Sequence, residues 1–375
     1  MKILFACGGT AGHINPAIAI ANYLKDNDSN TEILFAGNPN GMERKIVEKN
    51  GYSFSPIKVL GIQRKISLRN IKNNIKALWY LLWSSNRAKK IIEEFHPDVV
   101  MGTGGYVSGP VVRKAAKMGY KTIAMENNAL PGVTTKLLAK YVDKILLDVP
   151  ESMKYLPKNK NYIVTGNPVR EEIFSEDREK AREYYKVGNK LCILSFGGSL
   201  GAQKLNEAVA DFMAWHLNNE NYFHIHGSGS YYGPSYYYEM LKQKGVNAKD
   251  YDNLIIREYI EDMPRCLAAA DIVICRCGAI TLAELKAAGK ASILIPSPNV
   301  AENHQYHNAM VLVNHDAASI IEEKNLTGQS LCDMVKDLAN NPEKIKMYSE
   351  NAKSMSIKNA NERIRNEILS LVNEN

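Results

Sequence analysis

The sequence predicts an α/β protein made of two parallel-sheet domains separated by a cleft. Short apolar runs rich in β-branched residues alternate with segments of helical periodicity along almost the whole chain. Such alternation gives a parallel sheet that is covered by helices on both faces. The alternation pauses at a polar, proline-marked stretch, residues 150–160, and starts again after Pro168. We therefore expect one domain over residues 1–168 and a second over residues 169–355.

Each domain has its own series of expected strands. In the first domain they cover residues 2–7, 31–36, 98–101, 121–125 and 144–147. In the second, after a charged helix over 171–185, they cover residues 191–196, 222–226, 253–257, 271–275 and 291–295. The chain is expected to be helical from residue 329 onward. Its last segment, residues 356–375, carries an apolar stripe at helical spacing, so we expect it to return to the first domain.

Composition places the chain among soluble globular proteins. Of its 375 residues 45% are hydrophobic and 23% are charged, which is typical of that class. The net charge of +7 is modest and by itself indicates no nucleic-acid partner. No run reaches the ~20 apolar residues that span a bilayer. Glycine interrupts the N-terminal apolar run too early for a signal peptide, so residues 2–7 are expected to form a strand. The six cysteines are scattered through apolar segments and are interpreted as buried thiols rather than metal ligands.

Three glycine-rich turns stand where a strand is expected to lead into a helix: residues 8–13, 102–110 and 197–203. Glycine lets the backbone adopt positive φ and lets a ligand approach closely. A helix N-terminus offers free N–H groups and a positive dipole to an anion. None of the turns fits the dinucleotide or the P-loop fingerprint. They predict a phosphate or diphosphate site that belongs neither to a dehydrogenase nor to a P-loop nucleotidase.

The segment 276–309 brings hydroxyl-binding groups to the same edge of the second sheet. Gly278 is expected to open a helix that Gly289 ends, and Glu284 lies within it. Gln305 and Asn308 follow one strand later at helical spacing. An acid, an amide and a helix N-terminus in one βαβ unit favour a ligand with both hydroxyls and phosphate.

Seven motifs taken in order resemble one enzyme family from end to end. They are GGTAGHINPA, GTGGYVSGP, ENNALPGVTTKLLAK, VTGNPVR, FGGSLGAQ, RCGAITLAEL and HQYHNA. The family is that of the bacterial undecaprenyl-diphosphate-muramoylpentapeptide N-acetylglucosaminyltransferases of glycosyltransferase family 28, which make lipid II from lipid I. The resemblance implies a GT-B fold of two Rossmann-like domains and inverting transfer from UDP-GlcNAc without a cofactor. It also implies a peripheral location on the cytoplasmic face of the cell membrane, where cell-wall or division proteins are possible partners.

The resemblance also implies which residues border UDP-GlcNAc: Thr10, Ala11, Gly12, Asn128, Arg170, Ser199, Ile260, Ala279, Ile280, Thr281, Leu282, Ala283, Glu284 and Gln305. Within this set Ser199 would contact the diphosphate, Ile260 the uracil through its backbone, and Gln305 the sugar. The chain departs from the usual family pattern at Ala11, at Cys277 and over residues 314–318.

Transfer from a sugar nucleotide requires a stabilised leaving group and a base for the incoming hydroxyl. His13 is the leading candidate base, because it stands at the start of the first helix and imidazole is neutral near pH 7. Glu126 is a rival. Asp26 and Asp28 spell the DxD of metal-dependent transferases, but they lie in a polar turn after the first helix. We therefore interpret them as a solvated loop and expect no metal requirement.

A lipid acceptor requires a membrane-binding surface. Between Glu48 and Glu93 the chain has no acidic residue. Basic side chains contribute about 1 kcal/mol each near anionic lipid, and interfacial aromatic residues add anchoring. Apolar residues at helical spacing are also typical of a core stripe, so only part of this segment is expected at the surface. The predicted membrane residues are Lys72, Ile75, Lys76, Trp79 and Leu82.

Two other functions remain open at this point. One keeps the fold and changes the reaction, as in a diacylglycerol galactosyltransferase or a UDP-GlcNAc 2-epimerase. The other is a non-catalytic sugar-nucleotide sensor that recruits partners to the membrane. Loss of the base would favour the sensor, but His13 is present.

Overall fold

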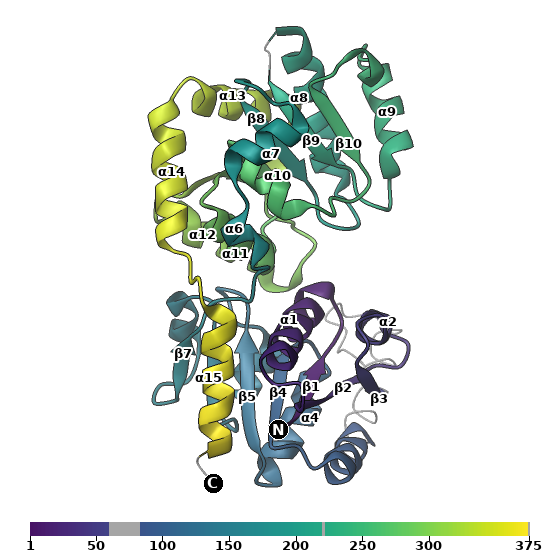
Figure 1. Ribbon diagram of the computed structural model, residues 1–375, viewed down its shortest axis with the longest axis vertical. Coiled ribbons are helices and arrows are strands. Elements are labelled where there is room, and N and C mark those ends of the chain that lie inside the picture. The colour runs from purple at the N-terminus through teal and green to yellow at the C-terminus, as the bar shows by residue number, and fades with distance from the viewer. Residues whose placement is uncertain (60–82, 220–221, 374–375) are drawn as a thin grey trace. The chain divides into compact units, whose positions relative to one another are not determined.

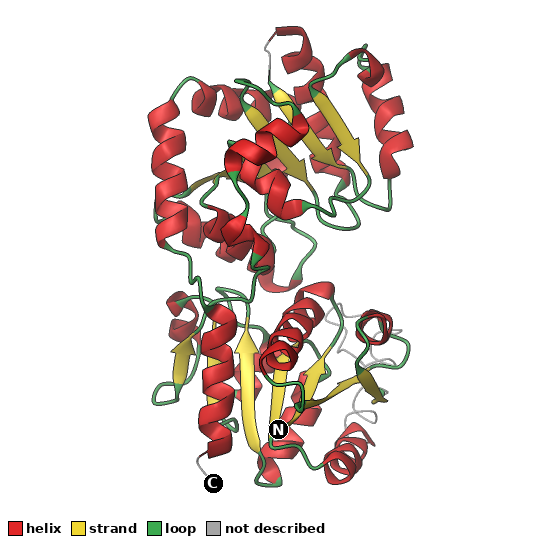
Figure 2. Ribbon diagram, in the orientation of Figure 1, coloured by secondary structure: helices red, strands yellow, loops and turns green. Residues whose placement is uncertain are grey.

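The computed structural model describes residues 1–59, 83–219 and 222–373 (Figure 1). The chain divides into two compact units, which we call the first unit (Met1–Val169 with Asn359–Asn375) and the second unit (Arg170–Lys358). Each unit contains one parallel sheet with helices on its faces (Figure 2). The predicted fold class of two parallel-sheet α/β domains is confirmed. Among the described residues, no helix is both long and apolar enough to cross a membrane.

The first unit holds a sheet of seven parallel strands in the order β3-β2-β1-β4-β5-β6-β7. The strands are β1 Lys2–Cys7, β2 Glu32–Gly37, β3 Ser53–Pro56, β4 Val99–Gly104, β5 Lys121–Glu126, β6 Lys144–Leu147 and β7 Tyr162–Val164. The helices are α1 Ala11–Asn27, α2 Met42–Lys49, α4 Ser108–Lys117, α5 Val133–Leu138, the 3-10 helix η1 Pro150–Tyr155 and α15 Ala360–Asn373.

Both faces of this sheet are buried. Residues alternate along β1, so that Phe5 packs in the layer with α1 while Leu4 packs in the layer with α4. The C-terminal helix α15 lies alongside β5 in Figure 1 and contacts α1, β4 and β5. Its stripe of Ile364, Ile368 and Leu371 is buried in the same core cluster as Phe5. The last helix of the chain thus belongs to the first unit's core.

The second unit holds a sheet of six parallel strands in the order β10-β9-β8-β11-β12-β13. The strands are β8 Cys192–Phe196, β9 Phe223–Gly227, β10 Leu254–Arg257, β11 Ile272–Cys275, β12 Ala291–Leu294 and β13 Ala318–Ile320. The α-helices are α6 Glu172–Ser175, α7 Arg178–Tyr185, α8 Gln203–Asn219, α9 Gly233–Gln243, α10 Met263–Ala269, α11 Ala279–Ala288, α12 His304–Val313, α13 Gly328–Ala339 and α14 Pro342–Ser354. The 3-10 helices are η2 Ala248–Asp250, η3 Ala301–Asn303 and η4 Glu323–Asn325.

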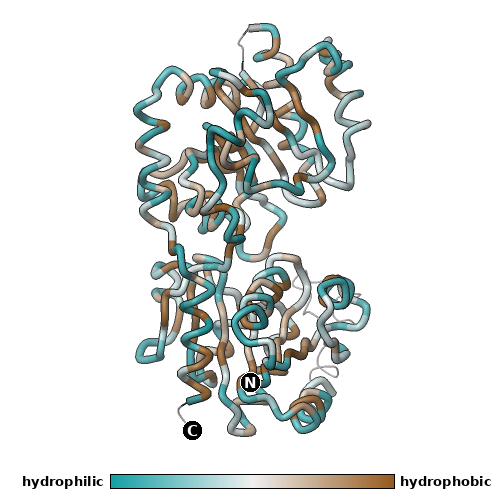
Figure 3. The backbone as a smooth tube through the Cα atoms, in the orientation of Figure 1, coloured by the Kyte–Doolittle hydropathy of each residue, from teal (hydrophilic) through white to brown (hydrophobic). Residues whose placement is uncertain are grey.

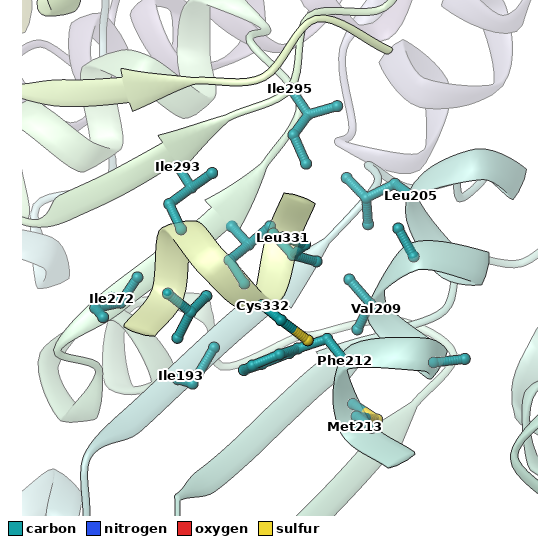
Figure 4. Packing of buried hydrophobic residues seen from close by; sticks show 14 of the residues in the cluster. Ile193, Leu205, Val209, Phe212, Met213, Ile272, Ile293, Ile295, Leu331 and Cys332 are labelled. Carbon is teal, nitrogen blue, oxygen red and sulfur yellow. The ribbon is translucent and has the colours of Figure 1, made fainter. Parts of the chain in front are cut away.

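The core of the second unit lies between its sheet and the pair α8 and α13. Ile193, Ile272 and Ile293 reach from the strands toward Phe212 of α8 and Leu331 of α13 (Figure 4). In Figure 3 the hydrophobic colour follows the strands of this unit. Continuous apolar runs of this kind are typical of parallel strands that are covered on both sides.

One prediction about the second unit is wrong, and one strand of this unit is missing from the expected set. The charged segment 171–185 is not one helix but two, α6 and α7, because the backbone turns to extended geometry at Glu176 and Asp177. The carboxylate of Asp177 accepts a hydrogen bond from the N–H of Lys180 at 2.8 Å and caps α7. Strand β13 was not expected, since its three residues are too short to show a period.

Candidate functional site

His13 lies in the first turn of α1, directly after the glycine turn that follows β1. Thr10 is the N-cap residue, with extended φ and ψ of −142° and 154°, and Ala11 and Gly12 begin the helix. The His13 Nδ1 atom lies 3.2 Å from the carbonyl oxygen of Gly8 and 3.2 Å from Thr10 Oγ1. A carbonyl oxygen only accepts, so Nδ1 of the neutral ring carries the proton and donates it to Gly8. The lone pair then resides on Nε2, as a general base requires.

The second glycine turn packs directly against this histidine. At Gly104, where φ is +113°, an added Cβ would lie 2.5 Å from His13 Cδ2. At Gly105 it would lie 2.0 Å from the carbonyl oxygen of Gly8. Thr103 Oγ1 also donates to the carbonyl of His13 at 2.7 Å. Two turns that are about 90 residues apart in the sequence thus hold one imidazole.

Glu126, the rival base, is engaged in shaping its own loop. Its Oε1 accepts hydrogen bonds from the backbone N–H of Asn128 at 3.0 Å and from Asn128 Nδ2 at 3.1 Å. Its Oε2 accepts one from the N–H of Gly132 at 2.9 Å. The side chain is buried. Because both oxygens order the loop that presents Asn128, a structural role for Glu126 is favoured over proton transfer.

In the second unit, Ser199 is exposed on the turn between β8 and α8. The backbone of this turn is left-handed at Gly198 and Gly201, with φ of +96° and +85°. The turn leads into a helix of 17 residues, whose first N–H groups have no partner within the helix. The arrangement is suited to an anion.

Helix α11 starts and ends at the predicted glycines. Gly278 is its N-cap, and Gly289 ends it in the left-handed conformation with φ of 61°. Ala279, Ile280 and Thr281 are partly exposed in the first turn, where their N–H groups are available. Leu282 and Ala283 are instead buried, so their side chains belong to the core.

Glu284 forms an ion pair with Arg170. The resemblance implicates both residues in donor binding. Arg170 Nη2 and Nε lie 3.0 and 3.3 Å from the same oxygen, Glu284 Oε1. Burial raises the pKa of Glu284, and the charge and hydrogen bond of Arg170 act in the opposite direction. The carboxylate is therefore oriented by Arg170 through one oxygen.

Gln305 is held by its carbonyl end. Its Oε1 accepts hydrogen bonds from the N–H groups of Ser297 at 2.8 Å and Cys277 at 3.2 Å. This fixes the amide so that its NH₂ group is the end left to bind a ligand. The loop before α12 is strained, because Glu302 and Asn303 have φ of 54° and 51°.

Ile260 follows β10 and is almost fully buried. A neighbouring network that the sequence did not indicate anchors its segment. Asp262 accepts hydrogen bonds from Tyr185 Oη and Arg257 Nη1, both at 2.6 Å. Burial opposes ionisation, but Tyr185 and the charge of Arg257 outweigh it and lower the pKa of Asp262. No local sequence pattern relates Tyr185 to Asp262, because they are 77 residues apart.

Other predicted residues lie apart from these groups. The predicted membrane residues Lys72, Ile75, Lys76, Trp79 and Leu82 lie outside the described residues. Asp28, at the C-terminal end of α1, accepts hydrogen bonds from the N–H of Asn30 and from Thr31 Oγ1, so it shapes its own turn. Within the described ranges, no group of three or more His, Cys, Asp or Glu side chains could hold a metal ion.

Comparisons with known proteins cover both units. Residues 3–147 match the glycosyltransferase family 28 N-terminal domain, and residues 192–364 match the C-terminal domain of that family. The UDP-N-acetylglucosamine–N-acetylmuramyl-(pentapeptide) pyrophosphoryl-undecaprenol N-acetylglucosamine transferase of Desulforamulus reducens is 42% identical over 95% of this chain and 94% of its own. The chain belongs to glycosyltransferase family 28. The transferase of the same name from Acetivibrio thermocellus is 40% identical over 97% of this chain and 96% of its own.

A solved family member has the same fold. The crystal structure of Acinetobacter baumannii MurG superposes with a TM-score of 0.79 at 26% identity, covering 98% of this chain and 99% of that one. This chain therefore has a GT-B fold, and its family and relatives make it an N-acetylglucosaminyltransferase.

Proposed function

We propose that the protein transfers N-acetylglucosamine from UDP-GlcNAc to the C4 hydroxyl of the muramoyl sugar of undecaprenyl-diphosphate-MurNAc-pentapeptide. The reaction converts lipid I to lipid II for peptidoglycan synthesis and inverts the configuration at the transferred carbon. The observation that carries this proposal is the 42% identity to a transferase of that name over 95% of this chain.

The second unit binds the donor. The turn at Ser199 and the first turn of α11 offer N–H groups to the diphosphate, and their helix dipoles favour its negative charge. Glu284, oriented by Arg170 at 3.0 Å, accepts hydrogen bonds from the ribose hydroxyls. The NH₂ group of Gln305 donates to the sugar. The backbone N–H groups of the Ser199 turn and of α11 also stabilise the charge that develops on the leaving diphosphate.

The first unit supplies the base. His13 Nε2 takes the proton from the acceptor C4 hydroxyl while the oxygen of that hydroxyl attacks C1 of N-acetylglucosamine. The bond from C1 to the diphosphate oxygen breaks, and UDP leaves with the electron pair. A single displacement inverts C1. The hydrogen bond from Nδ1 to Gly8 keeps the ring in the tautomer that this step needs.

The described part of the first unit also offers a surface suited to the cytoplasmic face of the membrane. Val133, Leu137 and Tyr141 are 45%, 63% and 41% exposed and follow one another at intervals of four residues. The guanidinium of Arg113 lies 5.0 Å above the Tyr141 ring, and Lys140 is exposed beside it. Apolar and aromatic side chains among basic ones are suited to an anionic lipid surface. We place the lipid-linked acceptor on this side of the protein.

The test is acceptor-dependent release of UDP. With UDP-GlcNAc and a lipid I analogue, the wild-type protein should release UDP and form the disaccharide product. His13→Ala should lower kcat by about 10²–10⁴-fold. The control is His315→Ala, which removes a histidine that bonds the carbonyl of Val311, and it should be fully active. UDP release without an acceptor and with a new monosaccharide would indicate an epimerase, and binding without turnover would indicate a sensor. Either result would refute the proposal.

A further inference from the structure

The loop after β9, residues 228–231, has no role in what is described above. We call it the bridging loop. In the sheet order β10-β9-β8, strand β9 lies between the strand that leads to Ile260 and the strand that leads to Ser199. Parallel strands end at a common edge, so the bridging loop lies between the two segments that are proposed to hold the ends of UDP.

On one side, the bridging loop holds the turn of Ser199. The N–H and the Oγ of Ser230 both donate to the carbonyl oxygen of Ser199, at 3.0 and 3.2 Å. The N–H of Tyr231 donates to the carbonyl of Leu200 at 3.2 Å. These bonds fix the peptide groups of the turn whose amides and hydroxyl would meet the diphosphate.

On the other side, it holds the segment that leads to Ile260. The N–H and the Oγ of Ser228 donate to the carbonyl of Arg257 at 2.9 and 3.2 Å, and the N–H of Gly229 donates to the carbonyl of Glu258 at 2.9 Å. Gly229 and Ser230 are consecutive. Two consecutive peptide groups thus join the Ser199 turn to Glu258, which lies two positions before Ile260.

The contact between the bridging loop and the Ser199 turn leaves no room for a side chain. A Cβ on Gly229 would lie 2.1 Å from the backbone nitrogen of Gly201, and a Cβ on Gly201 would lie 2.3 Å from the carbonyl oxygen of Ser228. Both glycines have φ of +85°, a conformation that other residues rarely adopt. The two backbones therefore touch directly. If they separated, the hydrogen bonds from Ser230 and Tyr231 to the Ser199 turn would be weakened.

We propose that the bridging loop is a positioning element that fixes the distance between the Ser199 turn and the Ile260 segment, so that the second unit selects a nucleoside diphosphate over the nucleoside alone. The proposal rests on the proposed function, which assigns the two ends of UDP to these segments. When two binding points are held at the bound distance, the second contact forms without an ordering cost. A loosened bridging loop would keep the uridine contact and lose most of the gain from the diphosphate.

The test is the ratio of the dissociation constants of uridine and UDP, measured on the full chain by displacement of a fluorescent UDP probe. Ser230→Ala removes one of two donors to Ser199, so UDP should bind about fivefold more weakly while uridine changes less than twofold. Ser230→Thr keeps the hydroxyl and should restore the ratio. Gly229→Ala should weaken UDP by more than tenfold. Its control is Gly245→Ala, where φ is +79° but no atom lies within 4 Å of the added Cβ, and it should leave the ratio unchanged.

Equal weakening of UDP and uridine, or an unchanged ratio in both Ser230→Ala and Gly229→Ala, would overturn the inference. If Gly229→Ala does not fold, the two Ser230 variants still decide. A wild-type protein that binds UDP but does not release it from UDP-GlcNAc in the presence of a lipid I analogue would refute the proposed function and leave the role of the bridging loop standing.

Discussion

Acidification is expected to destabilise the second unit through three buried histidines. His216, His224 and His226 are each 0% exposed. Ser195 Oγ lies 2.8 Å from His224 Nε2 and 2.8 Å from His226 Nδ1, and His216 Nε2 lies 3.1 Å from His224 Nδ1. Two ring nitrogens, Nδ1 of His216 and Nε2 of His226, have no partner among the described residues. Within the described residues, no carboxylate is hydrogen-bonded to these rings or acts on their pKa values, so an imidazolium ion there would have no negative partner.

The direction and the size of this change in stability with pH follow from the pKa values of the three histidines. Burial lowers the pKa of His216 and of His226 to about 3, and that of His224 well below its ordinary value. In the unfolded chain each histidine has a pKa of ~6.5 and binds a proton below it. The contribution of these neutral histidines to the free energy of unfolding is thus fully present above pH ~6.5. It is lost as the pH falls, by about 1.4 kcal/mol per pH unit for each histidine. Between pH 7 and pH 5, His216 and His226 together remove about 4 kcal/mol, and His224 adds to this loss.

The assay is hydrogen exchange of peptides from β8 and β9 at pH 7 and pH 5, corrected for intrinsic exchange rates. His226→Phe removes one titrating group in a pocket where the ring lies 4.3 Å from that of Tyr237, so the pH-dependent loss should shrink by about 2 kcal/mol. His96→Asn is the control, because His96 is exposed with φ of 50°, which asparagine tolerates. A loss in His226→Phe as large as in the wild type would refute the reasoning.

Three further substitutions test the two units. Gly104→Ala places a Cβ 2.5 Å from His13 Cδ2 and should lower kcat for UDP release about 10²-fold or more; an unchanged kcat would show that His13 need not be held there. Arg170→Gln leaves the partly buried Glu284 without its partner and raises the pKa of that carboxyl further, so KM for UDP-GlcNAc should rise about tenfold and more at pH 6 than at pH 8. An equal rise at both pH values would contradict it. Leu137→Glu should weaken binding to anionic vesicles about tenfold without changing kcat on a soluble acceptor; unchanged vesicle binding would show that this face does not meet lipid.

The sequence predicts most of the strands because they are buried on both faces. In the second unit the observed strands start and end within one residue of the expected positions, except for the short β13. Helix α11 is bounded as predicted because Gly278 and Gly289 bound it. The break between α6 and α7 was missed, since a charged segment has no apolar period to interrupt. Its only signal is Asp177 as an N-cap, and that signal competes with the helix propensity of the residues around it.

The residues that form the site are predictable by type, but their pairings are not. Glu284 and Gln305 were singled out because carboxylates and amides bind hydroxyls. The ion pair of Glu284 with Arg170 spans 114 positions and leaves no local trace. The same holds for Glu126, which as a lone acid after a strand resembled a base until its three hydrogen-bond donors were visible.

Glycine shows most clearly where the information lies. Gly104 and Gly245 both have positive φ, and a sequence can indicate only that each permits a turn. At Gly245 an added Cβ would meet nothing within 4 Å, whereas at Gly104 it would meet the imidazole of His13 at 2.5 Å. Gly245 serves its turn alone, whereas Gly104 creates the space that the imidazole of His13 occupies. In a functional strand-to-helix turn, the backbone passes close to another backbone segment or to a reactive side chain. A glycine at which an added Cβ would clash therefore distinguishes such a turn from an ordinary one.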